Sequence, residues 1–246
     1  MILREVCPQC KSPQYKKNGH IHNGKQNHHC HDCGRQCVQC FEQYLISEAK
    51  RGFIERLLVE RISLRGICRA VGVPLKGLLG FLVQCLAALP DHLHVQPVSC
   101  QHAVLIQRLA VAADAMASCV QQKANKPWIW STMDAKTRQI IAFHVGDRSH
   151  KSAEPLWAKI PQAYRQHATC YTDQYVVYEK VMPAAQHQAI SKLARKTNHI
   201  KRFNNTLRQR VSRLVREAWS FSKKLANHSG AIKLFIGHYN LTRVAA

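Results

Sequence analysis

The stretch that decides the fold is WIWSTMDAKTRQIIAFHV, residues 128–145. Two runs rich in Ile, Val, Thr and aromatic residues flank the polar turn DAKT (134–137), a pattern typical of a β-hairpin. Before it, AVLIQRLAVAA (103–113) fits either a buried strand or a helix, and we expect a strand near its end. After it, residues 152–160 predict a helix and ATCYT (168–172) predicts a short strand. From residue 197 onward the chain reads as helical.

The charge of the chain indicates a polyanionic partner. The 246 residues are 46% hydrophobic, enough for a sizeable core, and carry 36 Lys+Arg against 14 Asp+Glu, a net charge of +22. Nucleic acid is the first candidate and an anionic membrane the second. The longest apolar stretch, Gly77–Pro90, is shorter than the about 20 residues of a spanning helix. The N-terminus lacks an apolar run of signal-peptide length, so we expect no membrane partner and a cytoplasmic location.

The N-terminal segment, residues 1–42, indicates a metal site. It holds six of the eleven cysteines, and an odd total fits a disulfide framework poorly. Two Cys-x-x-Cys pairs about twenty residues apart are typical of a zinc-ribbon-like module that needs a closed, structural Zn²⁺ site. The expected ligands are Cys7, Cys10, Cys30 and Cys33.

Other ligand sets remain open for this segment. Cys37 and Cys40 could join the second pair in a rival four-thiolate site or form a second, partial one. His28, His29 and His31 could also substitute, although contact with solvent or phosphate is the simpler expectation. Four thiolates leave no open position for water, so a catalytic zinc is not expected.

Residues 43–90 predict a helical region. Ile54, Leu57, Leu58 and Ile62 recur at helical spacing. Residues 62–82 then read as a helix-turn-helix, with Gly72 in the turn, where a positive φ is cheap. The second helix, from Pro74, would enter the major groove of DNA. An ordinary helical hairpin is the alternative, and Lys76 is the only charge on the proposed recognition helix. The proline-flanked stretch that follows suggests a linker over residues 91–107.

Two acidic residues follow the predicted strands of the second half. Asp114 comes after the apolar run and Asp173 after the short strand. Carboxylates at strand ends can share divalent metal ions in a ribonuclease-H-like fold, where the ions activate an attacking oxygen and stabilise the leaving one. The plainer interpretation is that each aspartate is solvated or caps a local turn.

Several stretches together resemble the transposases of the insertion-sequence-one family. They are the N-terminal CPxC…CxxCGRQ pattern, GDRS (146–149), YTD (171–173), TNHIKRFNNTLRQR (197–210) and SFSKK (220–224). The resemblance covers nearly the whole chain. It implies a zinc finger and a helix-turn-helix fused to a DDE catalytic domain, which family members encode in the next reading frame.

The resemblance carries further expectations about organisation and partners. It implies a ribonuclease-H-like α/β catalytic domain over residues 108–246 in an α+β, multidomain chain. The expected partners are double-stranded DNA, as the element's terminal inverted repeats and as target, and further copies of the chain assembled on that DNA. The expected setting is the bacterial nucleoid, and the expected catalytic ion is Mg²⁺.

The resemblance also assigns the catalytic residues and exposes a departure. Asp114 and Asp173 match the first two acids, and Lys201 occupies the position of the third. An ammonium cannot coordinate Mg²⁺ while protonated, and two unit charges ~4 Å apart interact by about 4 kcal/mol at an effective dielectric near 20. Ala115 and Ala117 also replace a usual Glu and Trp. We therefore expect a DNA-binding transposase with impaired cleavage and strand transfer, or a catalytically dead repressor of transposition.

The C-terminal region is strongly basic. Between Lys192 and Lys224 there are eleven Lys and Arg residues against one acid, Glu217. This excess favours phosphate contact over a merely solvated face, and DNA binding should weaken steeply with salt. The candidate DNA-contacting residues are Lys76, Arg202, Arg208, Arg210, Arg213 and Arg216.

Overall fold

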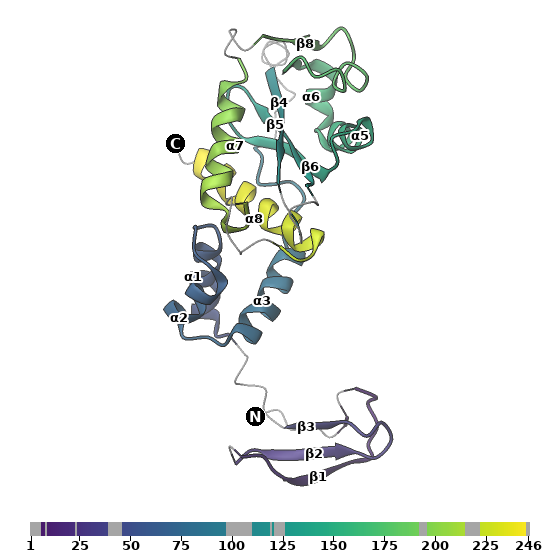
Figure 1. The fold of residues 1–246 in the computed structure, drawn as a ribbon, viewed down its shortest axis with the longest axis vertical. Coiled ribbons are helices and arrows are strands. Elements are labelled where there is room, and N and C mark those ends of the chain that lie inside the picture. Colours follow the sequence, from purple (N-terminus) through teal and green to yellow (C-terminus); the bar gives the residue numbers. More distant parts are fainter. Residues whose placement is uncertain are drawn as a thin grey trace.

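The computed structural model describes residues 6–7, 9–22, 24–38, 46–96, 110–118, 120, 126–191, 196–214 and 222–244. Within these ranges the chain is a mixture of α and β structure with a three-stranded and a five-stranded sheet (Figure 1). The prediction of an α+β chain that begins with a cysteine cluster is confirmed.

The first sheet is a small antiparallel meander in the order β1-β2-β3. It consists of β1 (Tyr15–His20), β2 (Gln26–Cys30) and β3 (Gln36–Val38). Only two of its side chains, those of His28 and Cys30, are buried. A segment of this size cannot rely on a hydrophobic core, so its stability has to come from the cysteine cluster beside it.

Three helices follow: α1 (Glu48–Leu58), α2 (Leu64–Val71) and α3 (Leu75–Ala87). The hydroxyl of Ser63 caps α2 by accepting from the Gly66 N–H, and Gly72 ends α2 at φ +65°. Their apolar sides form a separate core around Ile54, Ile67 and Leu78. Leu64, Cys68 and Val71 of α2 pack against this core beside Ile67.

The axes of α2 and α3 differ by 112° across the three-residue turn Gly72-Val73-Pro74. Taken together this bent pair has the length and apolar composition of a membrane span. Within the described ranges, no single helix is long and apolar enough to cross a membrane.

The second sheet has the order β6-β5-β4-β7-β8. Its strands are β4 (Ala110–Ala117), β5 (Trp128–Asp134), β6 (Ile140–Gly146), β7 (Thr169–Thr172) and β8 (His187–Ala189). β4, β5 and β6 are antiparallel, whereas β7 and β8 run parallel to β4. The predicted hairpin and the predicted strands before and after it are therefore confirmed, while β8 was not predicted.

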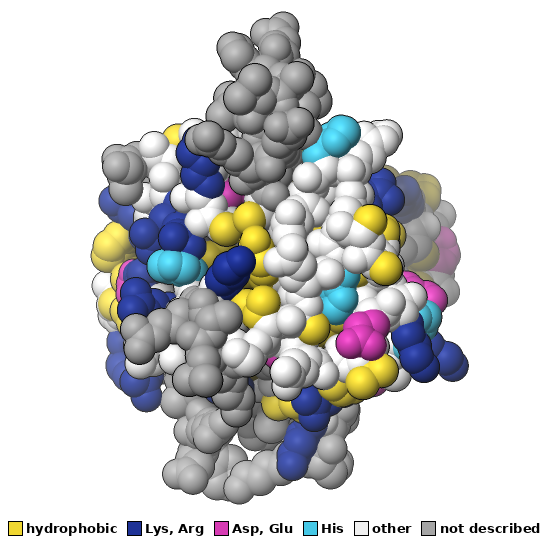
Figure 2. All heavy atoms as spheres, turned by 90° about the horizontal axis from the view of Figure 1, so that it is seen from above, with side chains coloured by type: hydrophobic (Ala, Val, Ile, Leu, Met, Phe, Trp, Pro, Cys, Tyr) yellow, Lys and Arg dark blue, Asp and Glu magenta, His cyan; other side chains and the backbone are white. Residues whose placement is uncertain are grey.

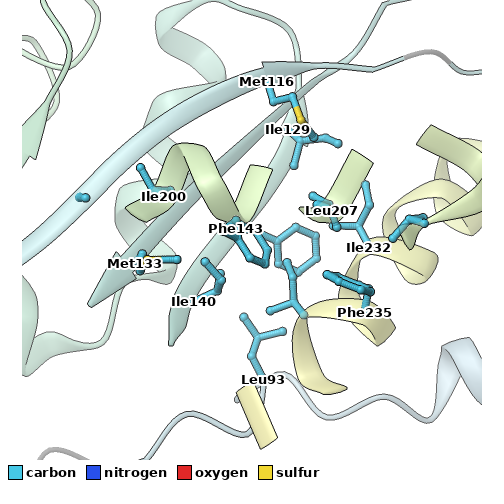
Figure 3. Packing of buried hydrophobic residues seen from close by; sticks show 14 of the residues in the cluster. Leu93, Met116, Ile129, Met133, Ile140, Phe143, Ile200, Leu207, Ile232 and Phe235 are labelled. Carbon is cyan, nitrogen blue, oxygen red and sulfur yellow. The ribbon is translucent and has the colours of Figure 1, made fainter. Parts of the chain in front are cut away.

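Helices cover both faces of this sheet (Figure 1). On one face lie α5 (His150–Lys159) and α6 (Gln162–His167), packed on alternate residues of β4 such as Val111 and Ala113. On the other lie α7 (Asn198–Arg210) and α8 (Leu225–Val244). Figure 3 shows Phe143 of β6, Leu207 of α7 and Phe235 of α8 converging in the core on that side.

The prediction of helix from residue 197 onward is wrong at one point. α7 ends at Arg210, and Val211 adopts φ −81°, ψ 105°, an extended conformation. Val211 is buried in the core under the sheet, so packing of this side chain outweighs helix continuation. A single 3₁₀ turn, Ser212–Leu214, follows it. Glu217, Trp219 and Phe221 lie outside the described residues.

The three N-terminal helices contact the domain that follows them through α3 and α8. The backbone of Gly230 in α8 lies against Leu86 of α3, and Lys233 Nζ binds Leu89 O at 2.9 Å and Asp91 Oδ1 at 2.5 Å. Arg210 of α7 pairs with Glu60. A cavity of about 370 Å³ lies between these helices.

The expected linker is described as far as Gln96, and that part packs against the second sheet. Leu93 is buried, and the Asn240 side chain in α8 donates to Leu93 O at 2.7 Å. The same amide donates to Ile140 O and accepts from the Ile140 N–H. Asn240 thus joins α8, β6 and residues 91–96 into one unit.

Candidate functional site

Four cysteines converge at the edge of the first sheet. The sulfur atoms of Cys7, Cys10, Cys30 and Cys33 all lie within 4.8 Å of one another. Cys7 Sγ is 3.6 Å from Cys33 Sγ, and Cys10 Sγ is 3.5 Å from Cys30 Sγ. Four thiolates at these separations could bind a zinc ion tetrahedrally, as in structural sites.

The two Cys-x-x-Cys turns have the same backbone geometry. In the first, the Lys11 N–H donates to Cys7 O and the Cys7 N–H to Ser12 O, both at 2.9 Å. In the second, Gly34 N–H donates to Cys30 O and Cys30 N–H to Arg35 O, both at 3.0 Å. A hydrogen bond from the Cys10 N–H is the main reason that the pKa of Cys7 is lowered to about 6, whereas burial and the neighbouring sulfurs raise the pKa of Cys10 to about 12. Without a metal, the cluster therefore favours the thiolate at Cys7 and the thiol at Cys10.

The rival ligand that the structure describes points elsewhere. Cys37 Sγ lies 3.0 Å from the Tyr15 hydroxyl instead of joining the four sulfurs. His28 stacks on the Tyr15 ring with centroids 4.8 Å apart, and burial lowers its pKa. Cys40 lies outside the described residues.

The register of the second sheet brings the two predicted catalytic aspartates to the same level. β4 pairs with β7 in parallel, with Ala112 opposite Tyr171. Continued by two residues, this register places Asp114 opposite Asp173. Asp114 lies two residues from both Ala112 and Met116 on β4, so all three share one face of the sheet, and Ala112 and Met116 pack toward α7 and α8. The aspartates therefore share the sheet face that α7 covers.

Asp114 interacts with groups from three parts of the chain. Burial raises its pKa, and the negative charge of Asp173 raises it further. The Asn204 side-chain amide donates to Asp114 Oδ2 at 3.0 Å, and the positive charge of Lys201 also lowers the pKa. Both residues lie on α7, and position 201 is one helical turn from Asn204, on the side of α7 nearer Asp114. We call Asp114 and Asp173 the acid pair.

Two further groups border the acid pair without having been predicted. The Tyr178 hydroxyl is buried, has no hydrogen-bond partner among the described residues, and has a pKa raised by burial and by the charges of Asp114 and Asp173. Asn204 links the Ser131 hydroxyl (3.4 Å) to Asp114. Tyr178 follows Asp173 by five residues and Asn204 lies in the quoted RFNN stretch, but nothing in their spacing indicates these contacts.

The predicted DNA-contacting residues lie in different environments. Lys76 and Arg202 are exposed on α3 and α7, and Arg208 is partly buried. Arg210 is paired with Glu60 and lies over the Phe235 ring, so its charge is shared within the chain. The side chains of Arg213 and Arg216 are outside the described part. Figure 2 shows many Lys and Arg side chains and few acids on one face, gathered mainly along its left edge.

Comparison with known proteins places the second half of the chain among insertion-sequence transposases. Residues 109–241 match the family model described as IS1 transposase. This match spans more than half of the chain and includes both aspartates and the whole of α7. The chain belongs to the IS1 transposase family.

Individual relatives agree with this assignment. The chain is 30% identical over 119 residues to the InsB protein of insertion element iso-IS1n from Shigella dysenteriae, covering 48% of this chain and 87% of that protein. It is 32% identical over 120 residues to the IS1 protein InsB of Shigella flexneri, covering 49% and 85%. The IS1 4 protein InsB of Escherichia coli K12 is 30% identical over 120 residues, covering 49% and 66%.

Proposed function

We propose that the chain is an insertion-sequence transposase that binds the DNA ends of its element and whose cleavage and strand-transfer activity is impaired by Lys201. The observation that carries this proposal is the environment of Asp114, which feels the negative charge of Asp173 and the positive charge of Lys201. This environment supports the proposal that the two aspartates and the residue at the third position, on α7, belong to one site.

The sheet supports a ribonuclease-H-like catalytic domain. Three antiparallel strands, β6-β5-β4, continue into two strands parallel to β4, and helices lie on both faces. The first and fourth strands of this sheet in chain order, β4 and β7, are adjacent. Asp114 lies inside β4 and not after it as expected, whereas Asp173 directly follows β7, so the two approach each other although 59 positions separate them. This is how Asp114 and Asp173 come to share a site in the proposed catalytic domain.

The N-terminal helices support a helix-turn-helix. Helix pairs of this class cross at about 90–120° with a short turn that often contains glycine, and α2 and α3 differ by 112° around Gly72. α3 would enter the major groove. Its exposed side carries Leu75, Leu79 and Val83, with Lys76 the only charge on the helix. Contacts with thymine methyl groups and phosphates therefore suit α3 better than a set of polar base contacts.

The donor set of the acid pair does not fit the two-metal chemistry of a complete DDE site. Asp114 and Asp173 supply carboxylate oxygens of the kind that Mg²⁺ binds. Protonated Lys201 supplies a positive charge and no lone pair for coordination, so it should lower the affinity of the acid pair for a metal cation. In this chain we assign to Lys201 the neutralisation of the acid pair beside bound DNA, and to Asn204 the orientation of Asp114.

Cleavage of a duplex that carries one end of the element tests the proposal. We expect the unchanged protein to bind this duplex and to leave it uncut in Mg²⁺ or Mn²⁺, and Lys201→Glu to cut it. Lys201→Gln removes the charge without adding a carboxylate, and should remain inactive. Lys136→Glu makes the same charge reversal at an exposed position outside the predicted DNA-contacting set, and should also remain inactive.

Two results would contradict the proposal. Robust cleavage by the unchanged protein would show that another residue serves as the third acid. Equal affinity for the element end and for a shuffled duplex of the same composition would show that the chain does not recognise its ends.

Lys201 also favours a second function, repression of transposition. A chain that occupies the ends without cutting them would compete with active copies. Co-expression with an active relative should then lower the transposition frequency of a marked element. Deleting residues 1–90, which hold the proposed end-binding parts, should abolish that effect. Unchanged frequency on co-expression of the full chain would exclude this role.

A further inference from the structure

The corner GDRS (146–149), between β6 and α5, holds an arginine that the proposed function has not used. The corner is tight, since a Cβ on Gly146 would lie 2.4 Å from Ser152 Oγ and 2.9 Å from His144 Nε2. Asp147 Oδ1 accepts from the Ser152 hydroxyl at 2.5 Å and from the Ser149 hydroxyl and N–H at 2.7 and 3.0 Å. The carboxylate is therefore occupied by serines and is not a partner for the arginine beside it.

The arginine, Arg148, is held against two aromatic rings. Its Cζ lies 4.5 Å from the centroid of the Trp128 ring and 4.6 Å from that of Tyr175. Its carbonyl oxygen accepts from the Tyr175 hydroxyl at 2.7 Å. Among the described residues it forms no ion pair with a carboxylate. Stacking holds the plane of the guanidinium, and the N–H groups along its edge remain available to a ligand.

Arg148 is linked to Asp173 through Tyr175, from the side of the sheet that α5 and α6 cover. The backbone N–H of Tyr175 donates to Asp173 Oδ1 at 3.3 Å, and the ring of the same residue lies under Arg148. The charge of Arg148 acts on the Tyr178 hydroxyl together with those of Asp114 and Asp173. Trp130, whose indole N–H donates to Asp147 O, packs between these tyrosines and the corner.

We propose that Arg148 binds a backbone phosphate of the DNA end, next to the phosphodiester that approaches Asp114 and Asp173. The chemistry suits this ligand: a planar guanidinium binds phosphate oxygens through two parallel hydrogen bonds. Lys201 offsets part of the negative charge of the acid pair, and Arg148 would supply a second positive charge for the neighbouring phosphate. The inference rests on the proposed function, because it requires DNA at the acid pair.

The experiment measures the affinity for the labelled element-end duplex at several salt concentrations. Arg148→Gln should weaken binding about tenfold, the loss expected for charged hydrogen bonds to one phosphate. The slope of log affinity against log salt should become shallower by about 1. Arg148→Lys keeps the charge but not the planar fork, so it should keep the slope and lose part of the affinity.

Arg243→Ala is the matched control. Arg243 also stacks on an aromatic ring, 4.8 Å from the Tyr239 centroid, and is exposed in the last turn of α8. Removing it should change neither affinity nor slope by a comparable amount. Thermal melting of each variant tests whether it is folded. If Arg148→Gln does not fold, the affinity and salt dependence of Arg148→Lys still test the assignment.

A scan with single neutral methylphosphonate linkages locates the contact. At one position near the cleavage site, the neutral linkage should weaken binding of the wild type by the same factor by which Arg148→Gln weakens binding to unmodified DNA. The same linkage should not weaken binding of Arg148→Gln further. If both proteins respond alike at every position, or if Arg148→Gln binds as Arg243→Ala does, the assignment of Arg148 is wrong. If the wild type fails to bind the element end at all, the proposed function fails instead.

Discussion

Asp114 is a carboxylate held partly out of water, and its pKa is raised mainly by that burial. An acid with a raised folded-state pKa destabilises the folded protein once it ionises. The cost is absent below the unfolded-state pKa, grows as the pH rises through the folded-state pKa, and is complete above it. At neutral pH the ionised Asp114 therefore lowers the stability of the domain.

Asp114→Asn should raise the stability at pH 7 by about 1 kcal/mol, or roughly 2–4 °C in melting temperature. The asparagine oxygen can still accept from Asn204. The gain should shrink as the pH is lowered toward 4, and any cleavage activity should be lost. Glu179→Gln, at an exposed acid, should leave the melting temperature unchanged. An unchanged melting temperature for Asp114→Asn at pH 7 would mean that Lys201 and Asn204 already compensate the burial.

At the scale of elements, the turn between α2 and α3 depends on one glycine. Gly72 has φ +65°, where a side chain is strained, although open space surrounds the position of its Cβ. Gly72→Ala should cost about 1–2 kcal/mol of unfolding free energy. Gly80→Ala, inside α3 with nothing near its Cβ, should instead gain about 0.5–1 kcal/mol. Urea unfolding of both variants measures these opposite changes in unfolding free energy. Equal changes would contradict the explanation that the positive φ of Gly72 makes a side chain unfavourable there.

The cysteine cluster gives a second prediction for an element. Cys30→Ser should abolish stoichiometric zinc binding and unfold the sheet β1-β2-β3, because a small polar segment of this kind folds on its metal. Cys37→Ser should retain zinc, since Cys37 contacts Tyr15 and not the four sulfurs. Metal analysis and circular dichroism read both outcomes. Loss of zinc in Cys37→Ser would contradict this assignment and would indicate that Cys37 is itself a zinc ligand.

Elements with strong local patterns were predictable, and contacts across the sheet were not. The hairpin 128–145 and the Gly72 turn follow from β-branched runs and from a glycine at a helix end. α6 and β8 were missed because six- and three-residue elements carry no clear periodicity. The end of α7 at Val211 is decided by tertiary packing, which outweighs local propensity.

The candidate site was predictable only in part, for the same reason. Asp114 and Asp173 were identified from their places after strands and from the family resemblance. The roles of Asn204, Tyr178 and Arg148 depend on which strands are neighbours and on which face α7 packs. Those facts are properties of the folded sheet, and sequence spacing does not contain them.

At the scale of the whole molecule, the close contact between Gly230 and Leu86 joins the N-terminal helices to the rest. A Cβ at Gly230 would lie 3.0 Å from Leu86 Cδ1 and 3.1 Å from its Cβ. Gly230→Val should therefore force α3 and α8 apart at a cost of about 1–3 kcal/mol. Calorimetry should show the helical region melting separately from the sheet domain. Gly52→Ala, with open space around its Cβ, should keep the wild-type transition. One unchanged transition in Gly230→Val would show that the two regions are not coupled there.

The contact of α3 with α8 also sets an order of events during translation. α3 is complete at Ala87, whereas α8 begins only at Leu225, so the ribosome makes all five strands of the second sheet before Gly230, the partner of Leu86, exists. Throughout that interval the C-terminal end of α3 has no cover. A message that stops before α8 would yield a product with this apolar side open, a ready substrate for chaperones and proteases.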